Sequence, residues 1–211
     1  MKKLRNNNTD KFITLEMIEN KKFLIQLFIS LSSHRENNSE VIRFNSLKEL
    51  ADELNVNEKT FNRQLKALEA EKVITIDKKL KTISINKIEL ERGRFTTLTE
   101  AEADVLLAVG ADDFVIKVYC YIKFLINKYK KICDETQKQI LEALSYSDSP
   151  TNKSKLKNAV KTLEDANLIQ TENFFDERGK RRIEYKLRVA PKAIIETNVI
   201  AAAAVPKGFK F

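Results

Sequence analysis

One stretch of this chain, residues 44–85, restricts the possible folds more than any other. Two short amphipathic helices are predicted on either side of a turn at residues 55–57. After Lys72 the apolar residues change from a period of about 3.6 to one of about 2, which marks the change from helix to strand. The two strands would flank a charged tip at residues 77–79, and residues 41–44 predict a third strand of the same sheet. This order predicts a winged helix-turn-helix, whose second helix can enter the major groove of DNA.

The residues at the helix starts support these boundaries. Ser46 and Glu49 have the spacing of a capping box, and Asn57 is a good N-cap for the second helix. The inward stripe of the second helix is predicted from its apolar residues: Phe61, Leu65 and Leu68.

The opposite face of this second helix, predicted over residues 57–69, is polar and basic. Arginine and asparagine are the residue types that read guanine and adenine edges, so Arg63 and Asn62 are candidates for base contacts. Lysine and threonine more often contact phosphates. The first set of predicted DNA-binding residues is Lys59, Thr60, Asn62, Arg63 and Lys66. An ordinary solvated helix face is the alternative interpretation.

The same pattern recurs in residues 111–190. A helix at 136–144 and a serine-rich turn precede a second helix that starts at Ser149 and Pro150, which suit the N-cap and first-turn positions. Two strands follow around a hairpin tip at 175–180. Matching the helix-to-strand junctions places Phe61 on Leu156, which indicates an internal repeat of architecture. The second predicted DNA-binding set is Asn152, Lys153, Lys155, Asn158 and Lys161.

Both predicted wings have basic tips that could contact phosphates or the minor groove. Gly179 would allow the second tip to turn sharply. The predicted wing contacts are Lys78, Lys79, Lys81, Arg178, Lys180, Arg181 and Arg182. Two units with so many cations would make numerous phosphate contacts, so we expect binding to weaken steeply with added salt.

Residues 112–132 form the strongest predicted helix, with an apolar stripe too wide for one buried face. This width predicts packing against both winged units or against a second copy of the chain, which makes a homodimer a candidate arrangement. Four lysines are predicted to occupy the remaining face of the helix: Lys117, Lys123, Lys128 and Lys130.

The expected fold is mainly α-helical with small β-wings: two tandem winged helix-turn-helix domains joined by a helical linker. We predict a mobile basic arm at 1–10, a first domain at 11–90, a linker helix at 91–110, a second domain at 111–190 and a C-terminal tail at 191–211. Thr99 and Glu102 predict a capping box for the linker helix. Residues 12–17 fit either a strand or a helix.

Composition and motif content favour some classes of function over others. The 211 residues carry a net charge of +8, which favours an acidic partner such as nucleic acid, although a lysine-rich solvated surface would give the same value. A single histidine, His34, and the lack of a glycine-rich phosphate loop or zinc-spaced Cys/His cluster predict no enzyme activity, cofactor or metal. Cys120 and Cys133 fit buried thiols in a reducing cytoplasm. No apolar run predicts a membrane span or secretory signal.

Two segments carry a family resemblance: FVIKVYCYIKFL, before the second helix-turn-helix, and DERGKRRIEYKL, at the second wing. On these segments the chain resembles the replication initiator proteins of plasmids and phages of low-GC bacteria. The resemblance covers roughly residues 23–189 and implies binding to repeated or inverted origin sites on double-stranded DNA, as a monomer or a dimer. A winged-helix transcription regulator and a protein-interaction adaptor that uses winged-helix units would have the same architecture.

Overall fold

The computed structural model describes residues 11–20, 23–33, 41–54, 56–86, 93–129, 135–179 and 181–188. These residues form eight α-helices and seven β-strands, with the strands in small antiparallel sheets. The predicted basic arm and C-terminal tail lie outside the described residues, as do His34, Lys130, Cys133 and Lys180. No helix in the described ranges is both long and apolar enough to cross a membrane.

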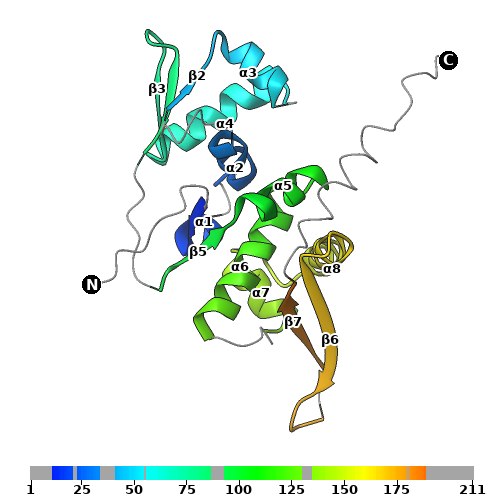
Figure 1. Cartoon of the computed structure of the whole chain (residues 1–211). Helices are drawn as coiled ribbons and strands as arrows, with labels where there is room; N and C mark the ends of the chain where they lie inside the picture. Colours follow the sequence, from blue (N-terminus) through cyan, green and yellow to red (C-terminus); the bar gives the residue numbers. More distant parts are fainter. Residues whose placement is uncertain are drawn as a thin grey trace, which may run out of the picture.

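Residues 25–85 form a unit in the upper part of Figure 1. Its elements are α2 (Ile25–Ser33), β2 (Val41–Arg43), α3 (Leu47–Glu53), α4 (Glu58–Ala70), β3 (Ile74–Asp77) and β4 (Thr82–Ile85). The strand order β2-β4-β3 confirms the predicted third strand. Asn57 caps α4 by accepting a hydrogen bond from the backbone N–H of Lys59 (3.1 Å). The apolar side of α4 is buried as predicted.

A second unit occupies the lower part of Figure 1. Its elements are α6 (Asp113–Tyr129), α7 (Gln137–Ala143), α8 (Pro150–Asp165), β6 (Ile169–Phe175) and β7 (Arg181–Leu187). Ser149 caps α8 as predicted, with its hydroxyl accepting from the N–H of Asn152 (3.2 Å). β6 and β7 form a two-stranded ribbon that projects from the body. Gly179 has a φ of +69° in the hairpin turn, a backbone conformation that suits glycine.

A strand pair lies between the two units. β1 (Lys11–Thr14) pairs antiparallel with β5 (Phe95–Leu98). Thr14 ends β1 and caps α1 (Leu15–Glu19), so residues 12–17, which fit either type, are part strand and part helix. This pairing joins the start of the predicted first domain to the predicted linker. The division of the chain into domains therefore stays a prediction. Thr99 and Glu102 form the predicted capping box of α5 (Glu100–Ala108).

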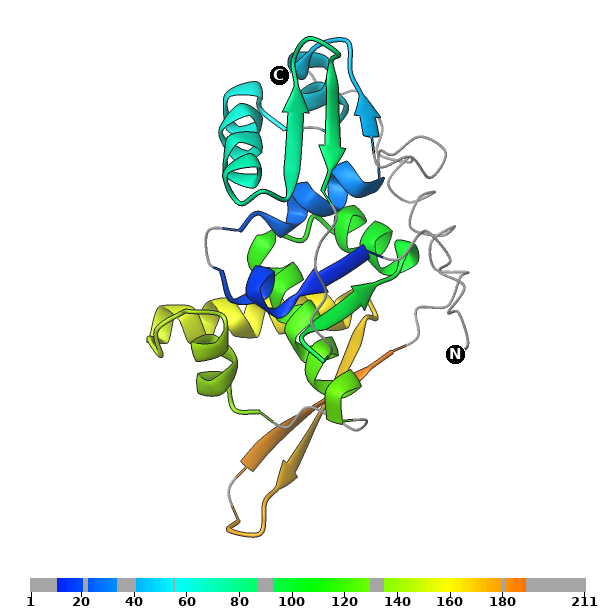
Figure 2. The same cartoon turned by 90° about the vertical axis from the view of Figure 1, so that its left-hand side faces the viewer.

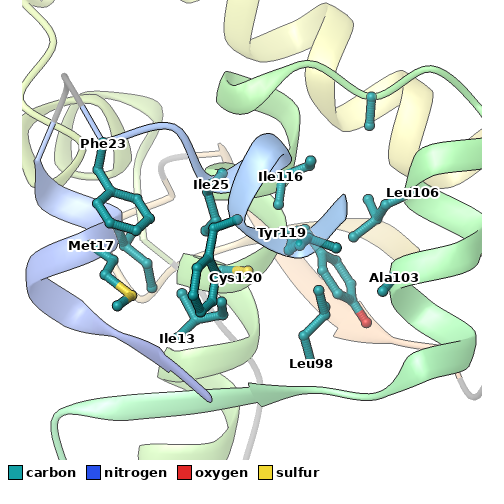
Figure 3. Close-up of a cluster of buried hydrophobic side chains, with 14 of the residues drawn as sticks. Ile13, Met17, Phe23, Ile25, Leu98, Ala103, Leu106, Ile116, Tyr119 and Cys120 are labelled. Atoms are coloured by element: carbon teal, nitrogen blue, oxygen red, sulfur yellow. The ribbon is translucent and has the colours of Figure 1, made fainter. Parts of the chain in front are cut away.

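Helix α6 lies at the centre of the core. It packs against α1, α2 and β5 on one side and against α8 and β7 on the other, so both of its apolar faces are buried within this chain. In Figure 3, Tyr119 and Cys120 of α6 lie among Ile13 from β1, Ile25 from α2 and other buried apolar side chains. The predicted two-sided burial is therefore confirmed.

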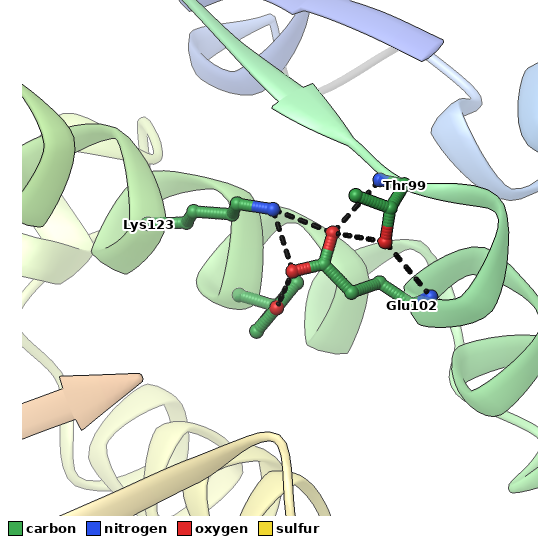
Figure 4. Close-up of polar contacts among 4 residues, drawn as sticks. Thr99, Glu102 and Lys123 are labelled. Carbon is green, nitrogen blue, oxygen red and sulfur yellow. Dashed lines mark hydrogen bonds and ion pairs between the residues drawn. The ribbon is translucent and has the colours of Figure 1, made fainter. Parts of the chain in front are cut away.

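Two of the lysines expected on the polar face of α6 are buried instead. The Lys117 ammonium donates a hydrogen bond to the backbone carbonyl of Asn20 (2.7 Å). The Lys123 ammonium contacts the carboxylate of Glu102 on α5 (Figure 4). The prediction assigned every lysine to the polar face because of its charge. The long apolar stem of a lysine can nevertheless pack in the core when its ammonium group contacts an oxygen. Lys128 is exposed as expected.

Candidate nucleic-acid interface

The outer face of α4 brings the first predicted set together. Lys59, Arg63 and Lys66 are exposed and follow one another at helical spacing, with half-buried Asn62 beside Arg63. Together with Glu58 they line a surface depression of about 530 Å³. Thr60 is half-buried and its N–H points to the Asn57 side chain (3.4 Å), so its backbone serves the helix cap.

The cations on this face are not neutralised by the residues that the structure describes. Within the described ranges, no carboxylate forms an ion pair with Lys59, Arg63 or Lys66. The opposite side of the helix is fixed in the core by Phe61 and Leu65. This arrangement presents a row of positive charge and one amide on a rigid helix, which suits contact with a polyanion.

The second predicted set, on α8, is more heavily engaged. The Asn152 amide donates to the carbonyl of Ser147 (2.9 Å), and Lys153 pairs with Asp148 (2.9 Å), so both help to hold the α7–α8 turn. The Lys155 ammonium lies 4.4 Å from the centre of the Phe114 ring. The exposed members, with Lys155, are Asn158 and Lys161.

Lys157 is an exposed cation on α8 that the predicted set omits. It lies one helical turn before Lys161, so the spacing of the two lysines could have identified it. The exposed polar and basic face of α8 therefore includes Lys157 in addition to Lys155, Asn158 and Lys161.

The first wing carries its three predicted cations at an ordered turn. The Asp77 carboxylate accepts hydrogen bonds from the N–H groups of Lys79 (2.8 Å) and Leu80 (2.9 Å), which fixes the turn. Lys78, Lys79 and Lys81 are exposed around it. Leu80 is exposed at the same tip, although the sequence prediction did not include it.

The second wing uses part of its charge internally. Arg182 pairs with Asp176 (3.0 Å), and the Arg181 guanidinium donates to the side-chain oxygen of Asn173 (3.0 Å). The Arg178 side chain is exposed and, within the described ranges, forms no ion pair. The aromatic side chain of Phe175 at the end of β6 is also exposed, and the predicted set omitted it.

The two units are held together by hydrogen bonds as well as by the core. The Asp113 carboxylate at the start of α6 accepts from the N–H of Gln26 on α2 (2.8 Å). The Ser145 hydroxyl, in the α7–α8 turn, donates to the carbonyl of Glu19 (2.9 Å). In Figure 2, α4 and the α7–α8 turn lie on the same side of the molecule, towards the left. One extended ligand on that side could contact both.

A metal centre has no support in the described residues, where no group of three His, Cys, Asp or Glu side chains is placed to hold an ion. The predicted absence of a metal stays a prediction for the whole chain.

Comparison with known proteins leaves the family open. No protein-family model matches the chain, and no curated protein matches it. A solved structure described as "Possible transcriptional regulator from Methanosarcina mazei Go1" is similar to part of it, with 16% identity over 55% of this chain and 87% of that one. The TM-score is 0.36, so this similarity carries no argument about fold or function.

Proposed function

We propose that this protein binds double-stranded DNA in a sequence-specific manner through the outer face of α4. The observation that carries the proposal is the exposed row of Lys59, Arg63 and Lys66, beside the Asn62 amide, with no ion pair to any residue that the structure describes. Arg63 and Asn62 contact base edges in the major groove, whereas Lys59 and Lys66 contact phosphates.

Both units act as winged helices in this proposal. The order α2-β2-α3-α4-β3-β4, with a β2-β4-β3 sheet, supports this assignment for the first unit. The second unit repeats the helix-helix-ribbon order with α7, α8 and the β6–β7 pair. The exposed cations of α8 and of both wings add phosphate contacts.

The biological role proposed within DNA binding is replication initiation of a plasmid or phage, carried out in the cytoplasm without enzymatic activity. It is supported by the resemblance of residues 114–125 and 176–187 to replication initiators. A transcription regulator is the alternative, since it would use the same surfaces. Direct repeats beside an A·T-rich stretch near the coding region favour an origin, and one inverted repeat over a promoter favours regulation.

The experiment is a binding selection from random duplex DNA with the intact chain, with the oligomeric state measured alongside. We expect enrichment of a defined motif. A homodimer through residues 112–132 would have to use the exposed end of α6, since the rest of that helix is buried. Absence of both an enriched motif and duplex affinity would contradict the proposal and favour the protein-interaction adaptor.

A further inference from the structure

The two wings share a feature that their charge does not explain. Four large hydrophobic side chains are exposed in the described ranges: Leu80 (73%), Phe175 (73%), Tyr129 (58%) and Val109 (38%). The two most exposed lie at the ends of the two ribbons, Leu80 in the β3–β4 turn and Phe175 at the end of β6. Single exposed hydrophobic residues are common on protein surfaces, but that alone does not account for the two most exposed ones lying one at the outer end of each ribbon.

Leu80 is presented by a rigid and strongly cationic turn. Hairpin tips usually contain glycine, asparagine or aspartate, so a leucine in this position contributes nothing to the turn itself. The hydrogen bond from its N–H to Asp77 holds the backbone. Exposed Lys78, Lys79 and Lys81 surround the apolar side chain.

Phe175 has comparable surroundings on the second wing. It lies opposite Arg181 in the ribbon register, next to the hairpin that carries Arg178. Next to it in the chain, Asp176, the first residue after β6, forms an ion pair with Arg182 of β7. Phe175 is therefore carried at the end of a braced ribbon whose opposite strand begins with Arg181.

We infer that Leu80 and Phe175 are wedges that enter the minor groove and separate adjacent base pairs, kinking the duplex at each wing. The inference rests on the proposed DNA binding and specifies how the wings take part in it. Leucine and phenylalanine are among the side chains that proteins insert between base steps. Flanking lysines and arginines neutralise the phosphates on both sides of the groove that the wedge opens.

The positions of the tips give the inference a geometric consequence. In Figure 2 the first wing points to the top of the molecule and the second to the bottom, with α4 and the α7–α8 turn between them. Two kinks at separate places would each bend the DNA toward its major groove, away from the inserted wing. The flanking cations favour DNA over an uncharged apolar partner.

The test measures DNA shape with the intact protein. End-labelled duplexes, one carrying the selected motif and one A·T-rich with several TA steps, report the end-to-end distance by energy transfer. 2-Aminopurine placed at successive steps reports unstacking. We expect the unmodified protein to kink the duplex by about 20° or more at each of two positions and to raise 2-aminopurine fluorescence there.

The variants assign the kinks to the two side chains. Leu80→Ala should abolish one site of unstacking and Phe175→Ala the other, and each should shorten the lifetime of the complex several-fold. Val109→Ala, which removes an exposed apolar side chain away from the wings, should change neither signal. Lys79→Ala should weaken binding and leave the kink in place.

The outcomes separate the two claims. Duplex binding without unstacking, or unstacking that persists in the Leu80→Ala/Phe175→Ala double variant, would overturn the wedge inference alone. A protein that binds neither duplex would overturn the proposed function and the inference together.

Discussion

At the scale of single residues, lysines that the sequence pattern places on the polar faces of helices have different surroundings in the structure. Lys66 on α4 is exposed and forms no ion pair among the described residues, Lys153 on α8 is paired with Asp148, and Lys117 on α6 is buried. A pattern of residue types identifies which helix face is basic. It does not show which charges are already neutralised, because the partners are distant in sequence or in a neighbouring turn.

Replacement of Arg63 by alanine should reduce discrimination between the selected and a random duplex by about 1–3 kcal/mol, because a bidentate base contact is lost. Arg63→Lys should keep the affinity for random duplex and still lose discrimination, since lysine retains the charge without the planar fork. Competition binding at one fixed salt concentration measures both. An equal loss on the two duplexes for Arg63→Ala would assign Arg63 to phosphates only.

Lys117 should make stability depend on pH in a defined direction. Burial lowers the pKa of Lys117 to about 8 from 10.5, although the charge of Asp113 opposes the shift. Between these values the unfolded chain binds more protons than the folded chain, so this group's contribution to stability rises with pH. The cost of burying the charge is fully present below pH 8.

Lys117→Met removes that cost and loses one hydrogen bond to Asn20. The free energy of unfolding of the variant minus that of the unmodified protein should therefore be highest below pH 8. This difference should fall by up to about 1.4 kcal/mol per pH unit from pH 8 to 10.5. Denaturant unfolding of both proteins across this range measures the difference. Burial also raises the pKa of Cys120 to about 12, which makes the free energy of unfolding fall as the pH rises. Because Cys120 is present in both proteins, its contribution cancels in the difference between them. A difference independent of pH would contradict the assignment.

At the scale of elements, the sequence predicts those features that depend only on neighbouring residues. Ser149 and Thr99 cap the helices that they were predicted to cap, because an N-cap acts within one turn of its own helix. The pairing of β1 with β5 was not predicted, because these strands lie more than eighty residues apart and each is only four residues long. The sequence of neither strand identifies the other as its pairing partner.

The junction of α5 and α6 depends on a buried ion pair that the sequence did not suggest. Glu102 accepts hydrogen bonds from Thr99 (2.8 Å) and Tyr119 (2.6 Å) and contacts Lys123. Burial would raise the pKa of Glu102, but the bonds from Lys123 and Tyr119 hold it below its ordinary value. The carboxylate is therefore ionised and paired at neutral pH.

Glu102→Gln should destabilise the protein by about 3–5 kcal/mol, because it leaves the buried Lys123 ammonium without a counter-charge. Glu100→Gln, at an exposed position on the same helix, should change stability by less than about 0.5 kcal/mol. Chemical denaturation at neutral pH compares the two. A loss of similar size for both would show that the pair at α5–α6 contributes no more than a surface carboxylate does.

At the scale of the molecule, α6 determines how the two basic helices are presented. It packs against α1, α2 and β5 on one side and against α8 and β7 on the other, and the Asp113 carboxylate at its start accepts a hydrogen bond from the N–H of Gln26 in the first unit. The width of its apolar stripe predicted this central place, but not the relative orientation of α4 and α8. That orientation depends on contacts such as Ser145 to Glu19, which join residues 126 positions apart.

The central claim is that the outer face of α4 binds duplex DNA, and its salt dependence is the most direct test. The triple variant Lys59→Ala/Arg63→Ala/Lys66→Ala should bind much more weakly and reduce the slope of log affinity against log salt by about two to three. The control Lys72→Ala/Lys128→Ala/Lys138→Ala removes the same charge from exposed positions elsewhere and should leave the slope nearly unchanged. Equal reductions in the two triple variants would show that net charge alone, and not this helix face, accounts for binding.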